Sequence, residues 1–458
     1  MPPPLADRAS PLLGCVALVG TTALAEIIAS SRLSFVPIAA LLGLANFAVY
    51  LWTFAVLGSP DVDPVRCPRP PVVALAGSIL VSPAALAMPS IFFSARGYAI
   101  DIRLVAALGA LALITAVLTL LLDRPGSAAA LWCRIGALAP LAIALRVAAI
   151  ASYPLDPDVA DMLPAIRVAA DRLLAGTVPY APIDLGAHTV PVAYLPGMWL
   201  PYVPLVALGL DLRWLNVGAL LVVSGLLAAL GARCRAASGV TALVGLFLFN
   251  PVLVARGDLY TGPAWLVIAL AAVLLARAPR WTGLVIGLGA ATQQIALVAI
   301  PGAVGYLVRR LGRRPAAASL AAGALLAFLA VAPFVVAAPD AFVYGIWGQY
   351  RRPEALELSA TRVVGLDVRP LMGLVGLDRL ALAAQVGATA AVGLLGMLRS
   401  RHPADALRWT GLATATFLLF NYPSWSYLWV QAWLWLAFAL LLRGGAQASS
   451  RGEPRLSR

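Results

Sequence analysis

The chain has few charged residues and no lysine at all. Only 12% of its 458 residues carry a charge, about half the share of a typical soluble domain. Because 62% of the residues are hydrophobic, a water-soluble fold would have too few polar side chains to cover its surface. The composition therefore excludes an ordinary soluble protein and indicates a membrane protein.

Histidine, cysteine and nucleotide-binding motifs are also scarce. The two histidines, His188 and His402, are too few for a His-rich metal site. The sequence contains no Walker-type loop, no dinucleotide fingerprint and no Gly-x-Ser-x-Gly elbow, which argues against ATP-driven pumping by this chain alone. The four cysteines fall in or near segments expected on the cytoplasmic side, so we expect no disulfide framework.

The hydrophobic residues form blocks of about 20, the length of helix that crosses ~30 Å of hydrocarbon. These blocks are rich in Ala, Leu, Gly and Val and do not alternate, so they predict helices rather than barrel strands. We expect an all-α polytopic protein with 13 or 14 membrane segments, near residues 11–30, 34–57, 71–90, 104–122, 131–151, 212–232, 239–255, 262–277, 281–292, 294–309, 315–337, 380–398, 406–420 and 423–442. The short pair 281–292 and 294–309 is also consistent with one bent helix. The proline-broken stretch 196–209 predicts a re-entrant or interfacial piece.

Arginine clusters orient these segments. They fall on one side, which the positive-inside rule assigns to the cytoplasm, so we expect both termini inside a multi-pass plasma-membrane protein. Two long loops, 152–195 and 338–369, then lie outside. We divide the chain into an N-terminal block of about four helices (1–125), a core (126–443) and a cytoplasmic tail (444–458).

The first outer loop carries three carboxylates close together: Asp156, Asp158 and Asp161. An amphipathic pattern follows and ends at Gly176, which predicts a helix along the outer membrane surface. The carboxylates have two explanations. Asp158 could cap this helix with Asp161 in its first turn, or one of the three could act as a general base for a hydroxyl. Spacing alone does not decide between them.

Other polar residues stand where the membrane disfavours them. Arg256, Arg351 and Arg352 are expected on the outer side, held there either by anionic lipid headgroups or by the phosphate of a membrane-borne substrate. Glu26 and Arg146 lie within apolar runs, near enough to the outer end that we expect their charges to reach the interface. Gln293 and Gln294 either line a polar cavity or satisfy broken backbone between two short helices.

The order of several motifs over 131–442 resembles the GT-C superfamily of membrane glycosyltransferases, and most closely the bacterial glycosyltransferase family 87. The matching stretches are Asp161 with Ala169–Tyr180, Tyr194–Pro204, Asn250-Pro251 with Gly257, Gly283–Pro301, Pro333–Phe342, and Asn421-Tyr422 with Tyr427–Trp429. Two departures stand out: Gln293 or Gln294 occupies the position where the family often has a lysine, and the four N-terminal helices lie outside the core pattern.

The resemblance implies a GT-C-like bundle that transfers a sugar, with mannose favoured, from polyprenyl phosphate to a hydroxyl of a glycan or glycolipid acceptor on the extracytoplasmic face, with inversion. It implies Asp161 as the catalytic base, followed by Asp158 and Asp156. The donor phosphate would contact Arg256, Arg351 and Arg352, and the sugar or acceptor would contact Tyr180, His188, Asp258 and Gln293. No residue is assigned to a metal, metal dependence stays open, and no nucleic acid is expected. The rival classes are a transporter or flippase of lipid-linked sugars and an inactive scaffold.

Overall fold

The computed structural model describes residues 10–30, 36–59, 62, 69–92, 98–123, 128–157, 160–185, 189–234, 236–256, 259–348, 365–421 and 424–452. In this part of the chain the protein is an all-α polytopic membrane protein, with one two-stranded sheet, in which β1 (Ile183–Asp184) pairs antiparallel with β2 (Thr189–Val190). Eleven segments of the described chain are long and apolar enough to cross a membrane.

These eleven segments match the expected ones closely. They are α1 (Pro11–Ser30), α2 (Val36–Gly58), α3 (Arg69–Phe92), α4 (Ile102–Leu121), α5 (Ala128–Ser152), α9 (Arg213–Gly231), α10 (Ala237–Leu248) with α11 (Pro251–Ala255), η5 (Gln294–Ala299) with α14 (Ile300–Leu311), α15 (Arg313–Ala337), α19 (Ala381–Arg399), and η8 (Ser426–Leu428) with α21 (Trp429–Gly452). Three further helices fill the remaining expected positions and are shorter or less apolar: α12 (Gly262–Arg277), α13 (Thr282–Thr292) and α20 (Pro403–Phe420).

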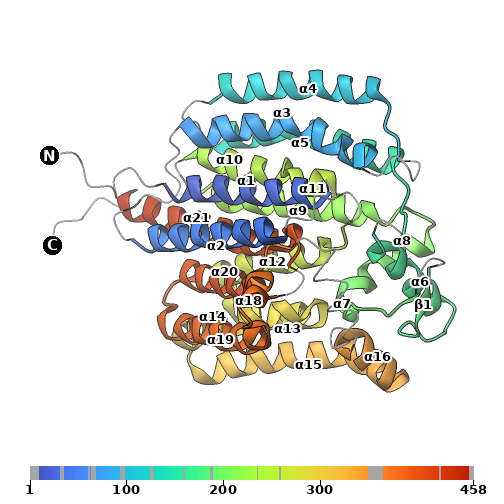
Figure 1. Cartoon of the computed structure of the whole chain (residues 1–458). Helices are drawn as coiled ribbons and strands as arrows, with labels where there is room; N and C mark the ends of the chain where they lie inside the picture. Colours follow the sequence, from blue (N-terminus) through green and yellow to red (C-terminus); the bar gives the residue numbers. More distant parts are fainter. Residues whose placement is uncertain are drawn as a thin grey trace, which may run out of the picture.

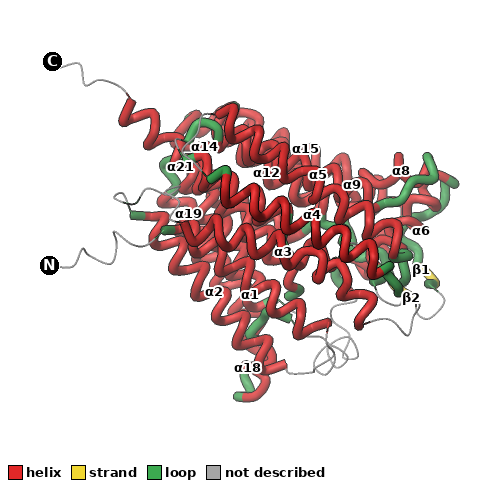
Figure 2. Tube along the Cα trace, turned by 90° about the horizontal axis from the view of Figure 1, so that it is seen from above, coloured by secondary structure: helices red, strands yellow, loops and turns green. Residues whose placement is uncertain are grey.

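The long helices lie side by side in one bundle, and α1 begins at the same end at which α21 ends (Figure 1). The opposite end carries short elements that we call the cap: α6 (Met162–Leu174), β1, β2, α7 (Pro196–Trp199), η3 (Leu200–Tyr202), α8 (Val203–Ala207) and α16 (Pro339–Ile346). A second view also places α6, α8 and the strands at one end of the long helices (Figure 2).

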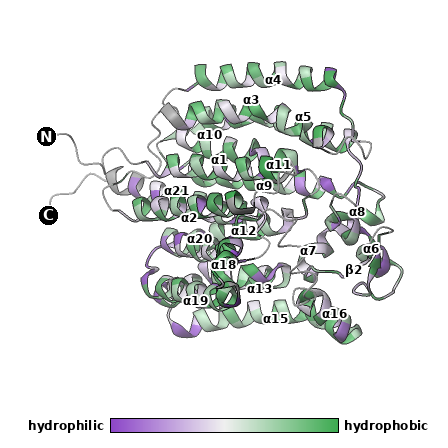
Figure 3. Cartoon of the chain, viewed as in Figure 1, coloured by the Kyte–Doolittle hydropathy of each residue, from purple (hydrophilic) through white to green (hydrophobic). Residues whose placement is uncertain are grey.

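Burial follows the pattern expected in lipid. Residues 239–250, along α10, are all buried, whereas peripheral helices leave large apolar side chains uncovered, such as Leu121 on α4 and Phe328 on α15, each 65% exposed. Hydrophobic residues cover the bundle, and hydrophilic ones gather near its ends (Figure 3). An apolar exposed surface of this extent requires a membrane around it.

Contacts cross the boundary that we expect at residue 125. Helix α1 packs on α2, α3 and α21, and α2 packs on α20. The Tyr50 hydroxyl of α2 donates to the Ala432 carbonyl of α21 at 2.9 Å. One hydrophobic core contains residues from the N-terminal helices and from the later ones. The N-terminal helices are therefore built into the bundle.

Helices α13 and α15 run in parallel in very close contact. The Gly283 amide donates to the Ser319 hydroxyl at 3.1 Å, and a Cβ at Gly287 would collide with the Gly323 carbonyl. Small residues four apart allow this approach, as they do in other membrane helix pairs. Helix α13 ends at Thr292, and Gln293 has an extended backbone before η5 begins. The segments 281–292 and 294–309 are therefore two elements and not one bent helix.

Helix α6 is amphipathic as expected, and Gly176 closes it with a φ of 69°. Its apolar face is not laid on lipid, however. Leu163, Ile166 and Ala169 are 0% exposed and belong to a second core, in which α6 packs on η3 and α8. The proline-broken stretch that follows supplies a protein surface for this face, and the position of α6 along the outer membrane surface stays a prediction.

Candidate functional site

The start of α6 places a carboxylate where the cap meets the bundle. Asp161 occupies the N-cap position of α6 and is half-buried, and within the described stretch 160–185 its side chain accepts no capping hydrogen bond. Asp156 lies just before it and is also half-buried. Capping therefore does not account for Asp161, although the residue occupies the capping position.

An aromatic row connects this point to the last helix. The Tyr427 hydroxyl of η8 lies 3.5 Å from the Met162 sulfur, directly after Asp161. The Tyr427 ring is 6.1 Å from that of Tyr260, which is 4.6 Å from that of Tyr194 in the cap (centroid distances). Residues from the cap, from the loop before α12 and from η8 thus meet at one place.

A buried ion pair lies beside this row. The Glu26 carboxylate on α1 accepts from Arg256 Nε at 2.5 Å and from the Ser426 hydroxyl at 2.5 Å. Glu26 is 3% exposed. Our expectation that its charge reaches the interface was therefore wrong. A buried carboxylate needs charge-assisted hydrogen bonds, and the fold supplies them from residues far along the chain.

Arg256 also borders a cavity of about 410 Å³ between α5, α9, α11 and α12, together with Arg146, Arg213, Asn216 and Trp265. Arg146 is 7% exposed and donates from Nη2 to the Leu248 carbonyl at 2.9 Å. It too stays inside the bundle, contrary to expectation. Three guanidinium groups therefore gather just inside the cap end.

Two side chains hold the walls of this cavity together. Asn216 on α9 accepts from the Tyr202 hydroxyl at 2.9 Å and from the Gly262 amide at 3.2 Å, which joins the cap to the start of α12. Arg213 forms an ion pair with Asp211 at 2.6 Å. Burial acts to raise the pKa of Asp211, but hydrogen bonds and charge from Arg213 outweigh it and leave the pKa below 3.8.

Tyr180 has a structural part in the cap. It is 1% exposed, donates to the Tyr194 carbonyl at 2.7 Å and accepts from Trp199 Nε1 at 3.2 Å. Burial raises the pKa of its phenol, so the hydroxyl keeps its proton and remains a donor. We had expected Tyr180 to hold a sugar hydroxyl, but here that hydroxyl is buried and occupied.

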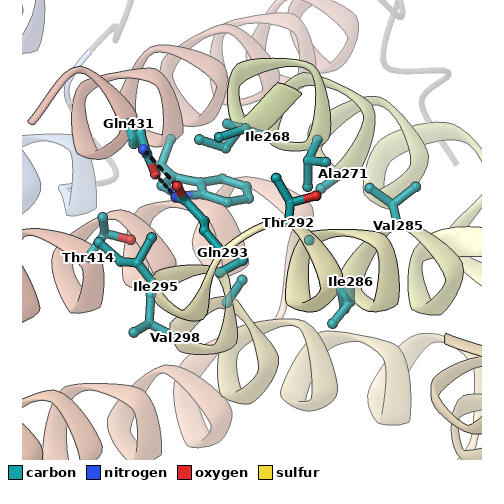
Figure 4. A pocket seen from close by; sticks show the side chains of 16 residues that line it. Ile268, Ala271, Val285, Ile286, Thr292, Gln293, Ile295, Val298, Thr414 and Gln431 are labelled. Atoms are coloured by element: carbon teal, nitrogen blue, oxygen red, sulfur yellow. Dashed lines mark hydrogen bonds between the residues drawn. The ribbon is translucent and has the colours of Figure 1, made fainter. Parts of the chain in front are cut away.

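Gln293 faces the interior of the bundle. It lines a second, mostly apolar cavity of about 460 Å³ between α12, α13, η5, α20 and α21, and its side chain pairs with Gln431 (Figure 4). Gln294 is exposed and contacts the Ile346 carbonyl of α16 at 3.4 Å. Gln293 therefore lines a cavity, but this cavity is mostly apolar and not the polar one of the expectation.

Five expected site residues lie outside the described part of the chain, namely Asp158, His188, Asp258, Arg351 and Arg352. Within the described part, no three His, Cys, Asp or Glu side chains are grouped as metal ligands are. Sequence reasoning missed Ser426 and Trp265, and it assigned Glu26 and Arg146 to the interface. For Glu26 and Arg146 the sequence does carry a signal of burial, because each is a charged residue within an apolar run.

The chain matches no family model, and neither the curated proteins nor the solved structures include a significant match to it.

Proposed function

We propose that the protein is a membrane glycosyltransferase that moves a sugar, with mannose favoured, from a polyprenyl phosphate to an acceptor hydroxyl. One observation carries the proposal. Three stretches that are far apart in the sequence meet at the junction of cap and bundle: Asp161-Met162 at the start of α6, Arg256, and Ser426-Tyr427. A chain of contacts thus links the start of α6, through Tyr427 and Ser426, to the ion pair between Glu26 and Arg256.

The reaction is a single displacement. The Asp161 carboxylate removes the proton of the acceptor hydroxyl, and the oxygen attacks the anomeric carbon. The bond between that carbon and the phosphate oxygen breaks, and its electron pair leaves with the polyprenyl phosphate. Guanidinium groups stabilise the charge that develops on the phosphate, and the anomeric configuration inverts. The proton passes from Asp161 to solvent after the product leaves.

The membrane geometry fits such a donor. The polyprenyl tail stays in hydrocarbon, while the phosphate and sugar lie at the boundary beneath the cap. On this proposal the cap is extracytoplasmic, the termini are cytoplasmic, and the protein resides in the plasma membrane, as the arginine distribution predicts.

The test uses purified protein in lipid vesicles with a radiolabelled polyprenyl-phosphate mannose and a panel of glycan and glycolipid acceptors. Asp161→Asn should lower the transfer rate at least a hundredfold, since general-base catalysis contributes about 10²–10⁴. The matched control is Asp171→Asn, which removes an exposed carboxylate from the same helix. If Asp161→Asn, Asp158→Asn and Asp156→Asn all transfer sugar like the wild type, the base assignment is wrong.

A flippase of lipid-linked sugars is the second candidate, and one feature favours it. The α13–η5–α14 region is interrupted at Gln293 inside the bundle, and interrupted helices are typical of transporter binding sites. The same vesicles distinguish the two. Movement of labelled lipid between leaflets without sugar transfer favours the flippase, and transfer that depends on Asp161 favours the enzyme.

A further inference from the structure

Several arginines of this protein cap the ends of helices. Arg213 donates to the Tyr153 carbonyl just beyond α5 at 2.8 Å. Arg309 donates to the Met397 and Leu398 carbonyls near the end of α19, each at 2.8 Å. Arg443 donates to the Ser59 carbonyl after α2 at 2.7 Å. Such bonds satisfy carbonyls that have no partner within their own helix, so these guanidinium groups are structural.

Arg146 also donates to a helix end, from Nη2 to the Leu248 carbonyl at the end of α10. It differs in its other nitrogen, because among the residues that the structure describes its buried Nη1 has no partner. The buried Nε1 of Trp265, a side chain that is 3% exposed, also lacks a partner in the described chain. Both residues line the same cavity. Two hydrogen-bond donors, one of them charged, are therefore buried there unsatisfied.

The charges around the cavity do not balance. Arg256 is paired with Glu26, and Arg213 is paired with Asp211. Among the described residues, the positive charge of Arg146 is the one around the cavity without a carboxylate partner. A buried cation without a counter-ion is costly, and an unpaired buried N–H adds to that cost. An anion with several acceptor oxygens would remove both costs.

We propose that this cavity is an oxyanion-binding site for a phosphate group, with Arg146 Nη1 and Trp265 Nε1 as its two free donors. Its role as the donor-phosphate site rests on the proposed function, but the binding itself does not require sugar transfer. Arg256 keeps Glu26 as its partner and closes one wall. The phosphate contact that the resemblance implies for Arg256 is thereby assigned to Arg146.

The depth of the cavity suits a phosphate carried on a lipid. Arg146 lies about 27 Å from the start of α5 at 1.5 Å per residue, close to the far boundary of a ~30 Å hydrocarbon layer. The neighbouring outer faces of α5 and α9 are apolar, with Val147 41% and Trp214 40% exposed. A prenyl tail can therefore lie in the membrane beside the site. Free phosphate has the same headgroup chemistry, and the experiment separates the two sources.

Binding is measured by thermal unfolding and by calorimetry of the full chain in detergent. The probes are farnesyl monophosphate, inorganic phosphate and uncharged farnesol. Arg146→Gln should weaken farnesyl monophosphate binding about tenfold or more, because a charged donor is lost. Trp265→Phe should weaken it about two- to tenfold, while its ring keeps the packing on Phe247 at 5.6 Å. Arg310→Gln, which removes an exposed arginine at the other end of the bundle, is the matched control.

Binding of farnesyl monophosphate but not of farnesol, lost in both site variants and kept in the control, supports the site. Equal binding of inorganic phosphate supports the same site with a soluble source. Wild-type affinity in Arg146→Gln and Trp265→Phe overturns it, as does an equal loss in Arg310→Gln. If the probe binds but no sugar is transferred, the proposed function fails and the site stands. If transfer proceeds normally in Arg146→Gln, the role of this cavity as the donor-phosphate site fails and the proposed function stands.

Discussion

Asp367 is a buried carboxyl group outside the membrane-spanning helices, and it should make stability depend on pH. It is 0% exposed, and its oxygens accept from the Ser424 and Arg369 amides, each at 3.2 Å. Burial raises the pKa of this carboxyl from 3.8 to about 7, although those two hydrogen bonds and the Arg369 charge act to lower it. The folded protein therefore binds this proton more tightly than the unfolded chain does.

The direction of the effect follows from that difference. The stabilisation from the protonated carboxyl is complete below about pH 4 and is lost as the pH rises through about 7. Three pKa units correspond to roughly 4 kcal/mol at 1.36 kcal/mol per unit, an upper figure. Between pH 5 and pH 8.5 only the two units from pH 5 to about 7 are lost, so the free energy of unfolding should fall by up to about 2.7 kcal/mol.

The assay compares thermal unfolding of the wild type and Asp367→Asn in detergent at both pH values. Asparagine offers one acceptor oxygen to two amides, so the variant should be less stable at pH 5 by about 1 kcal/mol. At pH 8.5 it should be the more stable protein, because it carries no buried charge. Asp340→Asn, at an exposed carboxylate, is the control. A stability difference between Asp367→Asn and wild type that is the same at both pH values would refute this reasoning.

Three further variants test packing and charge. Gly287→Leu should lower the melting temperature by several degrees, because overpacking costs about 1–3 kcal/mol and the nearest atoms are backbone, whereas Gly77→Leu, with open space around it, should not. Arg172→Met removes hydrogen bonds to the carbonyls of the 179–182 turn, so limited proteolysis should cut the cap severalfold faster. Glu26→Gln removes the buried carboxylate that pairs with Arg256 and should destabilise the protein by about 2 kcal/mol or more, and a double-mutant cycle with Arg256→Met should recover part of that loss.

The helices were predictable because lipid imposes a length and a composition on each of them. The segment 262–277 matches α12 at both ends, and 281–292 differs from α13 by one residue. The resemblance to GT-C glycosyltransferases stays a prediction, because the fold that it implies is a bundle of the kind that hydropathy alone predicts.

The candidate site was harder to predict because its contacts are not local. Glu26 and Arg146 each look like a charge near the end of an apolar run, and such a residue can reach the interface. Their burial depends on partners on other helices, at Arg256 and Leu248, which no spacing along the chain reveals. The apolar face of α6 is equally ambiguous in the sequence, since an amphipathic helix can bury such a face against lipid or against protein.

The Glu26 contacts also bear on how the chain is made. Glu26 enters the membrane 230 residues before Arg256 and 400 residues before Ser426 are synthesised. A carboxylate within the bilayer costs roughly 2.5–3.5 kcal/mol on insertion scales. The final depth of α1 is therefore unfavourable until the partners of Glu26 have been synthesised. A chain that ends at residue 420 should therefore show α1 more accessible to aqueous labelling reagents than the full chain does. We expect α1 to reach its final depth once Ser426, at the start of the last helix, has been inserted and can donate to Glu26.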